Sequence, residues 1–268
     1  MEYKLLALDL DDTLLNENHV ISPRCFSALQ KAAERGIMVT IATGRIFPSA
    51  LPYALQLGVT LPIIAYHGAL IRETTGEKKI FRQKYVPREL ALEIIPFLES
   101  EGFHVNLYLN DKIFVKEENE NTGFYQKVAP VAMNAVGDLS EYLKQEIDEP
   151  MKLTVINRQG RLPGLLEKLQ EKYGTVLSIA FSRSEFLEIT HIGATKGQAL
   201  KFLAESENLS ATQVIAIGDN YNDYDMIQYA GIGVAMGNAP EDVRQAANFV
   251  TGANTEDGVA LFLENYIL

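Results

Sequence analysis

The sequence lacks several features that would point to a secreted or membrane protein. Its single cysteine, Cys25, cannot form an internal disulfide, which suits a reducing compartment, and its neighbours indicate a packing role. No apolar run approaches the roughly 20 residues that span a bilayer, because acidic side chains interrupt the apolar segment at residues 5–15. We therefore expect a cytoplasmic protein with neither a signal peptide nor a membrane anchor.

Basic residues are scarce relative to acidic ones. The 24 Lys and Arg residues face 35 Asp and Glu residues, which gives a formal net charge of −11. Nucleic acids and anionic membranes are bound through basic patches, so this charge argues against both as partners. If the ligand is instead a small anion, local cations must reverse the field where it binds.

Clusters of cysteine and histidine are also absent from the sequence, so a zinc site has no support. The isolated histidines His19, His104 and His191 are expected to be structural. Nothing in the sequence identifies a protein partner.

What the sequence does contain is an alternation of predicted strands and helices near both ends of the chain. Apolar runs at residues 4–10, 37–42, 62–66 and 214–217 indicate buried strands, with helical patterns between them. Ser22 can cap the first of these helices. Strand-helix-strand order implies parallel strands joined by right-handed crossovers.

The pattern changes between residues 82 and 190. Paired strands with grouped helices there indicate an α+β layer. The predicted helices span 87–102 and 160–173, and the predicted strands span 103–109, 112–116, 152–156, 176–181 and 186–190. We therefore predict an α/β fold with a Rossmann-like parallel-sheet core, residues 1–81 and 191–268, and an inserted α+β domain, residues 82–190.

Polar residues gather where three predicted strands end. The segments are Asp9-Leu10-Asp11-Asp12-Thr13, Thr43-Gly44-Arg45 and Gly218-Asp219-Asn220-Tyr221-Asn222-Asp223. Ligands bind outside the carboxyl ends of parallel strands. Two like charges about 4 Å apart cost roughly 4 kcal/mol at an effective dielectric constant near 20, so the acids favour a bound cation, and an all-oxygen set suits Mg²⁺.

Helix caps and turns are the alternative explanation for these polar residues, and for any single segment they are the better one. Three strand ends together favour a site. Asp9 and Asp11 lie two apart, and a strand would point both side chains in the same direction.

The same residues resemble the four motifs of the haloacid dehalogenase-like phosphatases. The motifs are Asp9-x-Asp11-x-Thr13, Thr43, Lys196, and Gly218-Asp219-x-x-Asn222-Asp223. Their order, and an insertion of this size between the second and third motifs, are similar to the Cof-type branch, in which the inserted domain is a large α/β cap over the substrate. The resemblance covers the whole chain, strongly in the core and only by size in the cap.

The resemblance implies a role for each acid. Asp9 would be the nucleophile that forms an aspartyl-phosphate, and Asp11 would be the general acid and then the general base. Mg²⁺ would be bound by Asp9, by the backbone carbonyl of Asp11 and by Asp219. Asp223 would support the metal site without binding the ion directly.

The resemblance also implies how the phosphoryl group is held. The backbone amides of Leu10 and Gly44, the Thr43 hydroxyl, Lys196 and Asn222 would bind its oxygens. With the metal, these groups would reverse the negative field of the protein locally. Thr13 would order the loop of the nucleophile.

Two positions depart from the family pattern. Asp12 stands where the family often has glycine, and His67 stands where the Cof-type branch usually has asparagine. His67 could contact substrate or be a solvated turn residue, and both readings stay open. In the cap, Asn106, Tyr108 and Arg183 are candidate substrate contacts, although exposure on the surface is the simpler expectation for each.

The predicted function is hydrolysis of small phosphorylated metabolites, such as sugar phosphates, by a magnesium-dependent phosphatase. A phosphotransferase or mutase of the same superfamily is the main alternative. A receiver-like signalling domain also combines a parallel sheet, an acidic pocket and a phosphorylated aspartate, but it explains neither Asp11 nor the insertion.

Overall fold

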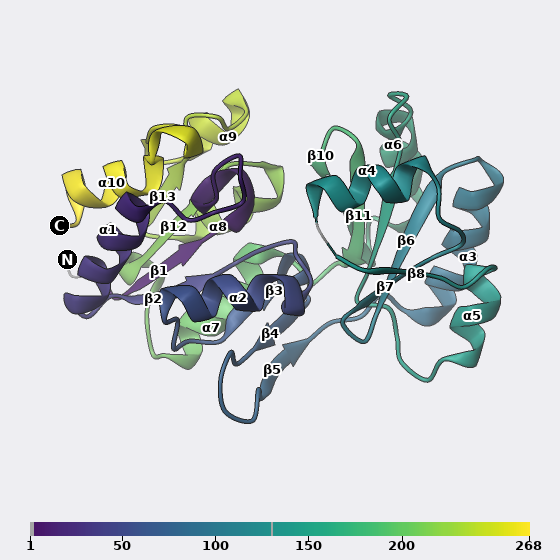
Figure 1. The fold of residues 1–268 in the computed structure, drawn as a ribbon, viewed down its shortest axis with the longest axis horizontal. Coiled ribbons are helices and arrows are strands. Elements are labelled where there is room, and N and C mark those ends of the chain that lie inside the picture. The colour runs from purple at the N-terminus through teal and green to yellow at the C-terminus, as the bar shows by residue number, and fades with distance from the viewer. Residues whose placement is uncertain (1–2, 130) are drawn as a thin grey trace. The chain divides into compact units, whose positions relative to one another are not determined.

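The computed structural model describes residues 3–129 and 131–268. These residues form two compact units, which are drawn as ribbons in Figure 1. The first unit comprises the chain up to Arg45 together with Ala50–Arg82 and Thr195–Leu268, and the second comprises Ile46–Ser49 and Gln83–Ala194. Most of the second unit is therefore one continuous insertion in the sequence of the first.

A five-stranded parallel sheet forms the centre of the first unit. Its order is β14-β13-β12-β1-β2, with parallel pairing throughout. The strands are β1 (Leu5–Leu8), β2 (Met38–Ile41), β12 (Val214–Gly218), β13 (Ile232–Ala235) and β14 (Phe249–Val250). Every residue of β1 and β12 is buried, which explains their uninterrupted apolar sequence. The predicted α/β class with a parallel-sheet core is confirmed.

Helices cover this sheet. Leu200 of α7 and Met226 of α8 share a buried cluster with Ala7 and Ala216 of the central strands. Helices α1 and α10 pack against each other, and Figure 1 shows them on the other side of the sheet from α7. The helices of this unit are α1 (Pro23–Glu34), α2 (Phe47–Leu57, from Ala50 onward), α7 (Lys196–Ser206), α8 (Tyr224–Tyr229), α9 (Glu241–Ala246) and α10 (Gly258–Tyr266).

Local sequence fixes where two of these helices begin. The Ser22 side chain accepts a hydrogen bond from the Cys25 amide at 3.1 Å, and Pro23 is the first helical residue of α1. The Thr195 hydroxyl accepts from the Gln198 amide at 3.3 Å, so that α7 begins at Lys196. Cys25 itself is buried, in keeping with the packing role expected of it.

The third predicted strand differs from expectation. It is β3 (Ile63–Ala65), which pairs antiparallel with β4 (Leu70–Arg72) in a separate three-stranded sheet completed by β5 (Ile80–Gln83). A single parallel bridge between Ala42 and Ile64 connects β3 to the end of β2. The apolar run predicted the strand but could not predict its neighbours.

The second unit contains a six-stranded mixed sheet of order β10-β11-β9-β6-β7-β8. Neighbouring strands in this sheet pair antiparallel, except β7 and β8, which are parallel. The strands are β6 (His104–Leu109), β7 (Lys112–Val115), β8 (Met133–Ala135), β9 (Lys152–Ile156), β10 (Leu177–Arg183) and β11 (Phe186–His191). The helices are α3 (Arg88–Ser100), α4 (Glu120–Val128), α5 (Leu139–Gln145) and α6 (Leu162–Tyr173).

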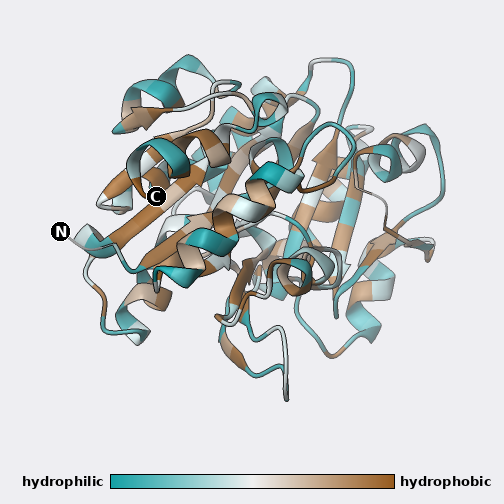
Figure 2. Cartoon of the chain, turned by 60° about the vertical axis from the view of Figure 1, so that its left-hand side comes forward, coloured by the Kyte–Doolittle hydropathy of each residue, from teal (hydrophilic) through white to brown (hydrophobic). Residues whose placement is uncertain are grey.

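The two faces of this second sheet have different chemistry. Alternate residues such as Leu107, Leu153 and Leu187 join α3, α5 and α6 in an apolar core. Figure 2 shows the alternation of brown and teal along these strands. The opposite face carries polar side chains, among them Tyr108 and Lys152, which are nevertheless buried.

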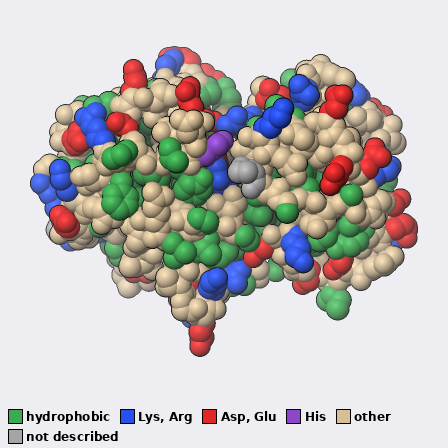
Figure 3. All heavy atoms as spheres, viewed as in Figure 1, with side chains coloured by type: hydrophobic (Ala, Val, Ile, Leu, Met, Phe, Trp, Pro, Cys, Tyr) green, Lys and Arg blue, Asp and Glu red, His purple; other side chains and the backbone are tan. Residues whose placement is uncertain are grey.

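Charged side chains are spread over the surface. Figure 3 shows Lys and Arg residues scattered among Asp and Glu on the face in view. Within residues 3–129 and 131–268, no helix combines the length and apolar character needed to cross a membrane.

Candidate active site

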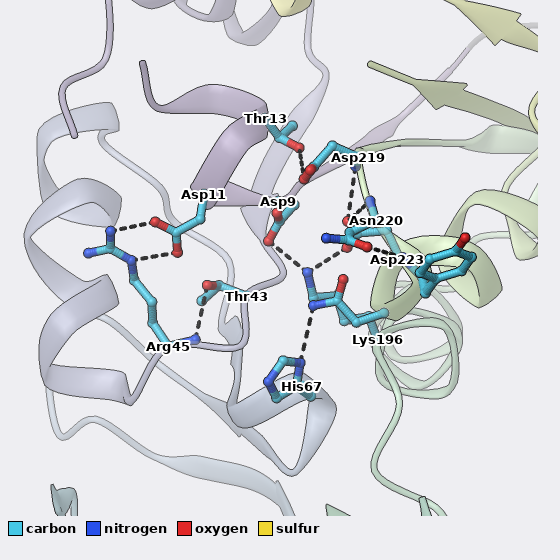
Figure 4. Close-up of polar contacts among 12 residues, drawn as sticks. Asp9, Asp11, Thr13, Thr43, Arg45, His67, Lys196, Asp219, Asn220 and Asp223 are labelled. Atoms are coloured by element: carbon cyan, nitrogen blue, oxygen red, sulfur yellow. Dashed lines mark hydrogen bonds and ion pairs between the residues drawn. The ribbon is translucent and has the colours of Figure 1, made fainter. Parts of the chain in front are cut away.

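The carboxyl ends of β1 and β12 bring Asp9 and Asp219 together. These strands are parallel neighbours with Leu8 opposite Ile217, and the Asp9 amide donates to the Ile217 carbonyl at 3.0 Å. Lys196 reaches the same place from the start of α7. Its Nζ lies 2.7 Å from Asp9 Oδ1 and 2.5 Å from Asp223 Oδ1, as Figure 4 shows.

Three buried carboxylates form the centre of the site. Asp9, Asp219 and Asp223 can each offer an oxygen such that these atoms lie within 4.8 Å of one another. The Thr13 hydroxyl donates to Asp219 Oδ1 at 2.9 Å, so the loop after β1 also orients the carboxylate after β12. Gly218 is required here, because a Cβ at this position would overlap the Asp223 side chain.

Burial makes these charges interact strongly. Burial and repulsion by Asp223 raise the pKa of Asp9 to about 7, although Lys196 acts in the opposite direction. Burial, followed by repulsion from Asp223 and Asp9, raises the pKa of Asp219 well above its ordinary value. For Lys196, burial alone would lower the pKa, but Asp223 and Asp9 outweigh it and raise the pKa, so Lys196 is a permanent cation.

The donor set fits a divalent metal ion. Three carboxylates against one ammonium group leave an excess of negative charge, which a cation would remove. Asp223 already uses Oδ1 for Lys196, and its Oδ2 accepts from the amides of Asp219 and Asn220 at 3.0 and 3.1 Å. Asp9 and Asp219 are therefore better placed than Asp223 to offer oxygens to a hard cation such as Mg²⁺.

Asp11 lies apart from this cluster. It is in an irregular helical turn, Leu10–Leu14, that follows β1 and in which Asp12 has φ = 58°. Its two carboxylate oxygens accept from Arg45 Nε at 2.8 Å and Arg45 Nη2 at 2.6 Å, and Figure 4 shows its side chain directed away from Asp9. The expectation that Asp9 and Asp11 point the same way is therefore wrong, because the strand ends at Leu8 and the turn redirects Asp11.

The loop after β2 forms another wall of the site. The Thr43 hydroxyl accepts from the Arg45 amide at 3.1 Å, which leaves its own hydrogen available to a ligand, and Thr43 is fully buried. The imidazole of His67 occupies the space that a Cβ on Gly44 would need. His67 Nδ1 lies 3.3 Å from Asn222 Nδ2, so His67 joins the loop of Gly44 to the segment after β12.

Most residues predicted from the sequence meet in the first unit. Asp9, Lys196, Asp219 and Asp223 form one connected group, Leu10 is buried in the turn after Asp9, and Thr43, Gly44 and Asn222 are joined through contacts with Arg45 or His67. Of the two readings left open for His67, a solvated turn is wrong, because only 8% of the residue is exposed.

Sequence reasoning missed the contacts that Arg45 and His19 make beside Asp11. Arg45 follows Thr43-Gly44 at a strand end, and an arginine in that position was a signal for a carboxylate partner. His19, expected to be purely structural, has Nδ1 3.5 Å from Arg45 Nη2 and 3.9 Å from Asp11 Oδ1. No pattern in the sequence connects His19 to Asp11.

In the second unit, surface exposure is the wrong expectation for Asn106 and Tyr108, which are fully buried, while Arg183 is half-buried. The Tyr108 hydroxyl donates to that of Tyr125 at 2.7 Å and accepts from Thr154 at 3.0 Å. These side chains therefore form a polar layer inside the second unit.

Comparison with known proteins identifies the family to which this fold belongs. The chain matches the haloacid dehalogenase-like hydrolase family over residues 6–263. It is 35% identical to a protein named as a phosphatase in Haemophilus influenzae, over 98% of each chain, and 29% identical to pyridoxal phosphate phosphatase YbhA of Escherichia coli, over 100% of each. A solved structure described as the subclass IIB sugar phosphatase BT4131 is 25% identical with a TM-score of 0.85, over 98% of each chain. The chain belongs to the haloacid dehalogenase-like hydrolases, as its motifs predicted.

Proposed function

We propose that the protein is a magnesium-dependent phosphatase that hydrolyses phosphoric monoesters of small metabolites through an aspartyl-phosphate on Asp9. The observation that carries the proposal is the contact of Lys196 Nζ with Asp9 Oδ1 inside a buried group of carboxylates. A carboxylate with a cation fixed beside it can attack a phosphorus atom whose oxygens that cation also attracts. The phosphatases among the relatives support this reaction class.

Two displacements at phosphorus make up the proposed reaction. In the first, a carboxylate oxygen of Asp9 bonds to phosphorus, the ester P–O bond breaks, and the leaving oxygen takes a proton from Asp11. In the second, water attacks the aspartyl-phosphate, gives its proton to Asp11 and releases inorganic phosphate, which restores the Asp9 carboxylate. Division into two steps lowers each barrier.

The exposure of Asp11 and its separation from the clustered acids support its proposed acid–base role, for which its carboxyl must turn from Arg45 towards the leaving oxygen. Its side chain is 32% exposed, whereas that of Asp9 is 7% exposed, so Asp11 can exchange protons with solvent and Asp9 is shielded from it. Arg45 keeps the Asp11 carboxylate away from the three clustered acids and hence away from a metal bound there. A group that transfers protons must keep its side chain free of the metal.

Donors for the phosphoryl oxygens are proposed on two sides. Thr43 and the amides of Gly44 and Leu10 would bind them from the loops after β2 and β1. Lys196 and Asn222 would bind them from the other side. A net charge of −11 makes such local donors necessary for binding an anion.

The metal is proposed as Mg²⁺, held by Asp9, the Asp11 carbonyl and Asp219, with Asp223 orienting the set. When bound, it would neutralise the charges of nucleophile and phosphoryl group so that the two anions can approach. The excess of buried carboxylates over ammonium groups supports this choice of cofactor.

The substrate is proposed to be a small phosphorylated metabolite such as a sugar phosphate. The two relatives above with stated substrates are named for pyridoxal phosphate and for sugar phosphates. Substrate class thus varies within the family while the reaction is shared. A screen of phosphate release over many phosphorylated metabolites, with and without Mg²⁺, would identify the substrate, and release without an acceptor would separate a hydrolase from a phosphotransferase.

Substitutions of three neighbouring acidic residues test the mechanism. Asp9→Asn should abolish hydrolysis of p-nitrophenyl phosphate with the fold intact. In Asp11→Asn, the aspartyl-phosphate should still form, but its hydrolysis should be slow. Asp12→Asn is the matched control and should keep most of the activity, because the Asp12 side chain has no step in the mechanism. Activity in pure Asp9→Asn protein would refute the mechanism.

A further inference from the structure

His67 has no part in the steps above, yet it lies beside groups proposed to bind phosphate. Its amide donates to the Thr43 carbonyl at 3.0 Å, and its imidazole lies against Gly44. On the other side, Nδ1 is 3.3 Å from Asn222 Nδ2. The ring therefore connects the two sides from which the phosphoryl oxygens would be held.

The backbone around His67 is strained. Tyr66, His67 and Gly68 have φ of 51°, 57° and 100°, which is a left-handed backbone conformation that residues other than glycine adopt only rarely. The Tyr66 amide donates to the Arg45 carbonyl at 3.0 Å, and a Cβ on Gly68 would overlap the Thr195 carbonyl. Such strain persists only where surrounding contacts enforce it, and it is common at functional sites.

The hydrogen bond between His67 and Asn222 leaves the amide incompletely paired. Because Nδ2 is a donor, it can bond to the imidazole Nδ1 that faces it only in the tautomer whose Nδ1 is unprotonated. Asn222 Oδ1 is buried and, within the part of the chain that the structure describes, has no hydrogen-bond partner. An unprotonated phosphoryl oxygen cannot provide one, because it too is an acceptor.

Rotation of the amide by half a turn would give Asn222 Oδ1 a partner. Asn222 Oδ1 would then face the imidazole and accept from His67 once the ring proton is on Nδ1. Both hydrogens of Nδ2 would be available to phosphoryl oxygens. The ring proton moves from Nε2 to Nδ1 by exchange with water, so the change needs no net uptake of protons.

We propose that His67 is a positioning residue for Asn222, and that binding of a phosphoryl group reverses their hydrogen bond so that His67 Nδ1 donates to Asn222 Oδ1. This inference rests on the proposed function, since the ligand is taken to be a phosphoryl group. It assigns His67 to recognition of the phosphate and not of the rest of the substrate.

Two substitutions of His67 separate positioning from packing. In His67→Asn, asparagine tolerates the left-handed backbone and places a polar amide near the position of Nδ1. His67→Leu fills the space without a polar atom. His104→Leu is the matched control, because His104 is also 8% exposed but belongs to the second unit.

The readout is the inhibition constant of inorganic phosphate against p-nitrophenyl phosphate. We expect an increase of about tenfold for His67→Leu, which corresponds to roughly 1.4 kcal/mol, about threefold or less for His67→Asn, and less than about twofold for His104→Leu. In an Asn222→Ala background, His67→Leu should cause no further increase, because its effect acts through Asn222. A further loss of similar size would assign His67 a packing role and overturn the inference, provided thermal unfolding shows that the variants are folded.

A spectroscopic measurement tests the reversal independently of turnover. The chain has only four histidines, so ¹⁵N NMR of the imidazoles can resolve His67, with His67→Asn as the assignment control. On addition of Mg²⁺ and inorganic phosphate, Nδ1 of His67 should become protonated. If Nδ1 stays unprotonated in the phosphate complex, or if no phosphate binds, the inference is wrong. A protein that binds phosphate and shows the reversal but hydrolyses no ester would refute the proposed function alone.

Discussion

Replacing Lys196 by methionine removes the cation at the centre of the carboxylate cluster. The Lys196 side chain is 0% exposed and contacts both Asp9 and Asp223. Methionine is of similar length and flexible enough to fill the same space. The variant therefore changes the charge of the site with little change in its volume.

The expected loss follows from the geometry. Removing one partner of a buried ion pair costs about 3–5 kcal/mol, because the other charge stays buried without compensation. In this site the partners are two carboxylates, with Asp219 beside them. Proton uptake limits the cost, since the pKa of Asp9 is already raised to about 7. We expect the free energy of unfolding of Lys196→Met to fall by about 3–5 kcal/mol near neutral pH without metal.

Magnesium should reduce this loss. Without the ammonium group, a divalent cation meets the same carboxylates with less repulsion, so Mg²⁺ should stabilise the variant more than the wild type. Hydrolysis should not recover, because the phosphoryl oxygens would lose Lys196 as their proposed charged donor, and the removal of one such donor lowers kcat by about 10²–10³.

Urea unfolding with a chelator and with excess Mg²⁺ measures both effects. The chain has no tryptophan, so far-UV circular dichroism is the appropriate signal. Lys152→Met is the control, because Lys152 is 2% exposed and its Nζ lies 3.1 Å from Glu188 Oε2 in the second unit. Its loss of stability should not depend on Mg²⁺.

Two results would refute this reasoning. One is a loss below about 1 kcal/mol for Lys196→Met in chelator, the size expected of an exposed ion pair. The other is an equal response of the two variants to Mg²⁺, which would mean that the charge of Lys196 does not oppose binding of the metal.

Three further predictions concern the same unit. Arg45→Lys keeps the charge but loses the paired contact with Asp11, so kcat should fall about tenfold, the effect of a charged hydrogen bond of roughly 1.5 kcal/mol. Gly44→Ala should cost about 1–3 kcal/mol of stability, because the added Cβ overlaps His67, and His67→Ala should restore part of it. In metal-free protein, folding raises the pKa of Asp9 from 3.8 to about 7, so the folded state binds this proton more tightly than the unfolded state. The free energy of unfolding should therefore fall as pH increases through this interval. Excess Mg²⁺ should flatten that dependence.

Each of these has a clear contrary outcome. Unchanged kcat in Arg45→Lys would show that the orientation of Asp11 does not depend on Arg45. Additive losses in the Gly44 and His67 double variant, measured by urea unfolding, would mean that the two residues do not compete for space. An unfolding free energy that increases between pH 4 and 7 in Asp9-containing protein relative to Asp9→Asn would contradict the assigned direction of the pKa.

The parallel sheet was predictable because its central strands are buried on both sides. Residues 4–10 and 214–217 read as continuous apolar runs, and the acids that interrupt them mark the end of each strand. The antiparallel pairing of β3 with β4 was not predictable in this way. A strand of three buried residues carries no pattern that distinguishes one neighbour from another.

The acids of the site were predictable for a related reason, since several charges at one sheet edge need a common explanation. The direction of Asp11 was not, because it depends on a turn in which Asp12 takes a positive φ and on a guanidinium group 34 residues away in sequence. The burial of His67 depends on Gly44 and Asn222 together. Such contacts among distant residues leave no local trace in the sequence.

The first unit is built from segments made before and after the insertion, and this has a consequence for synthesis on the ribosome. Asp9 and Asp11 are translated before the insertion, and Asp219 and Asp223 follow about 210 residues later. Asn238 and Asn254 then hold the loop after β1 through the carbonyls of Asp12 and Leu15. The second unit, nearly all one continuous segment, can fold while the first waits for its partner strands. A nascent chain stalled before β12 would carry Asp9, the proposed nucleophile, without Asp219 and Asp223, so competence for hydrolysis would arise only after β12 has been made.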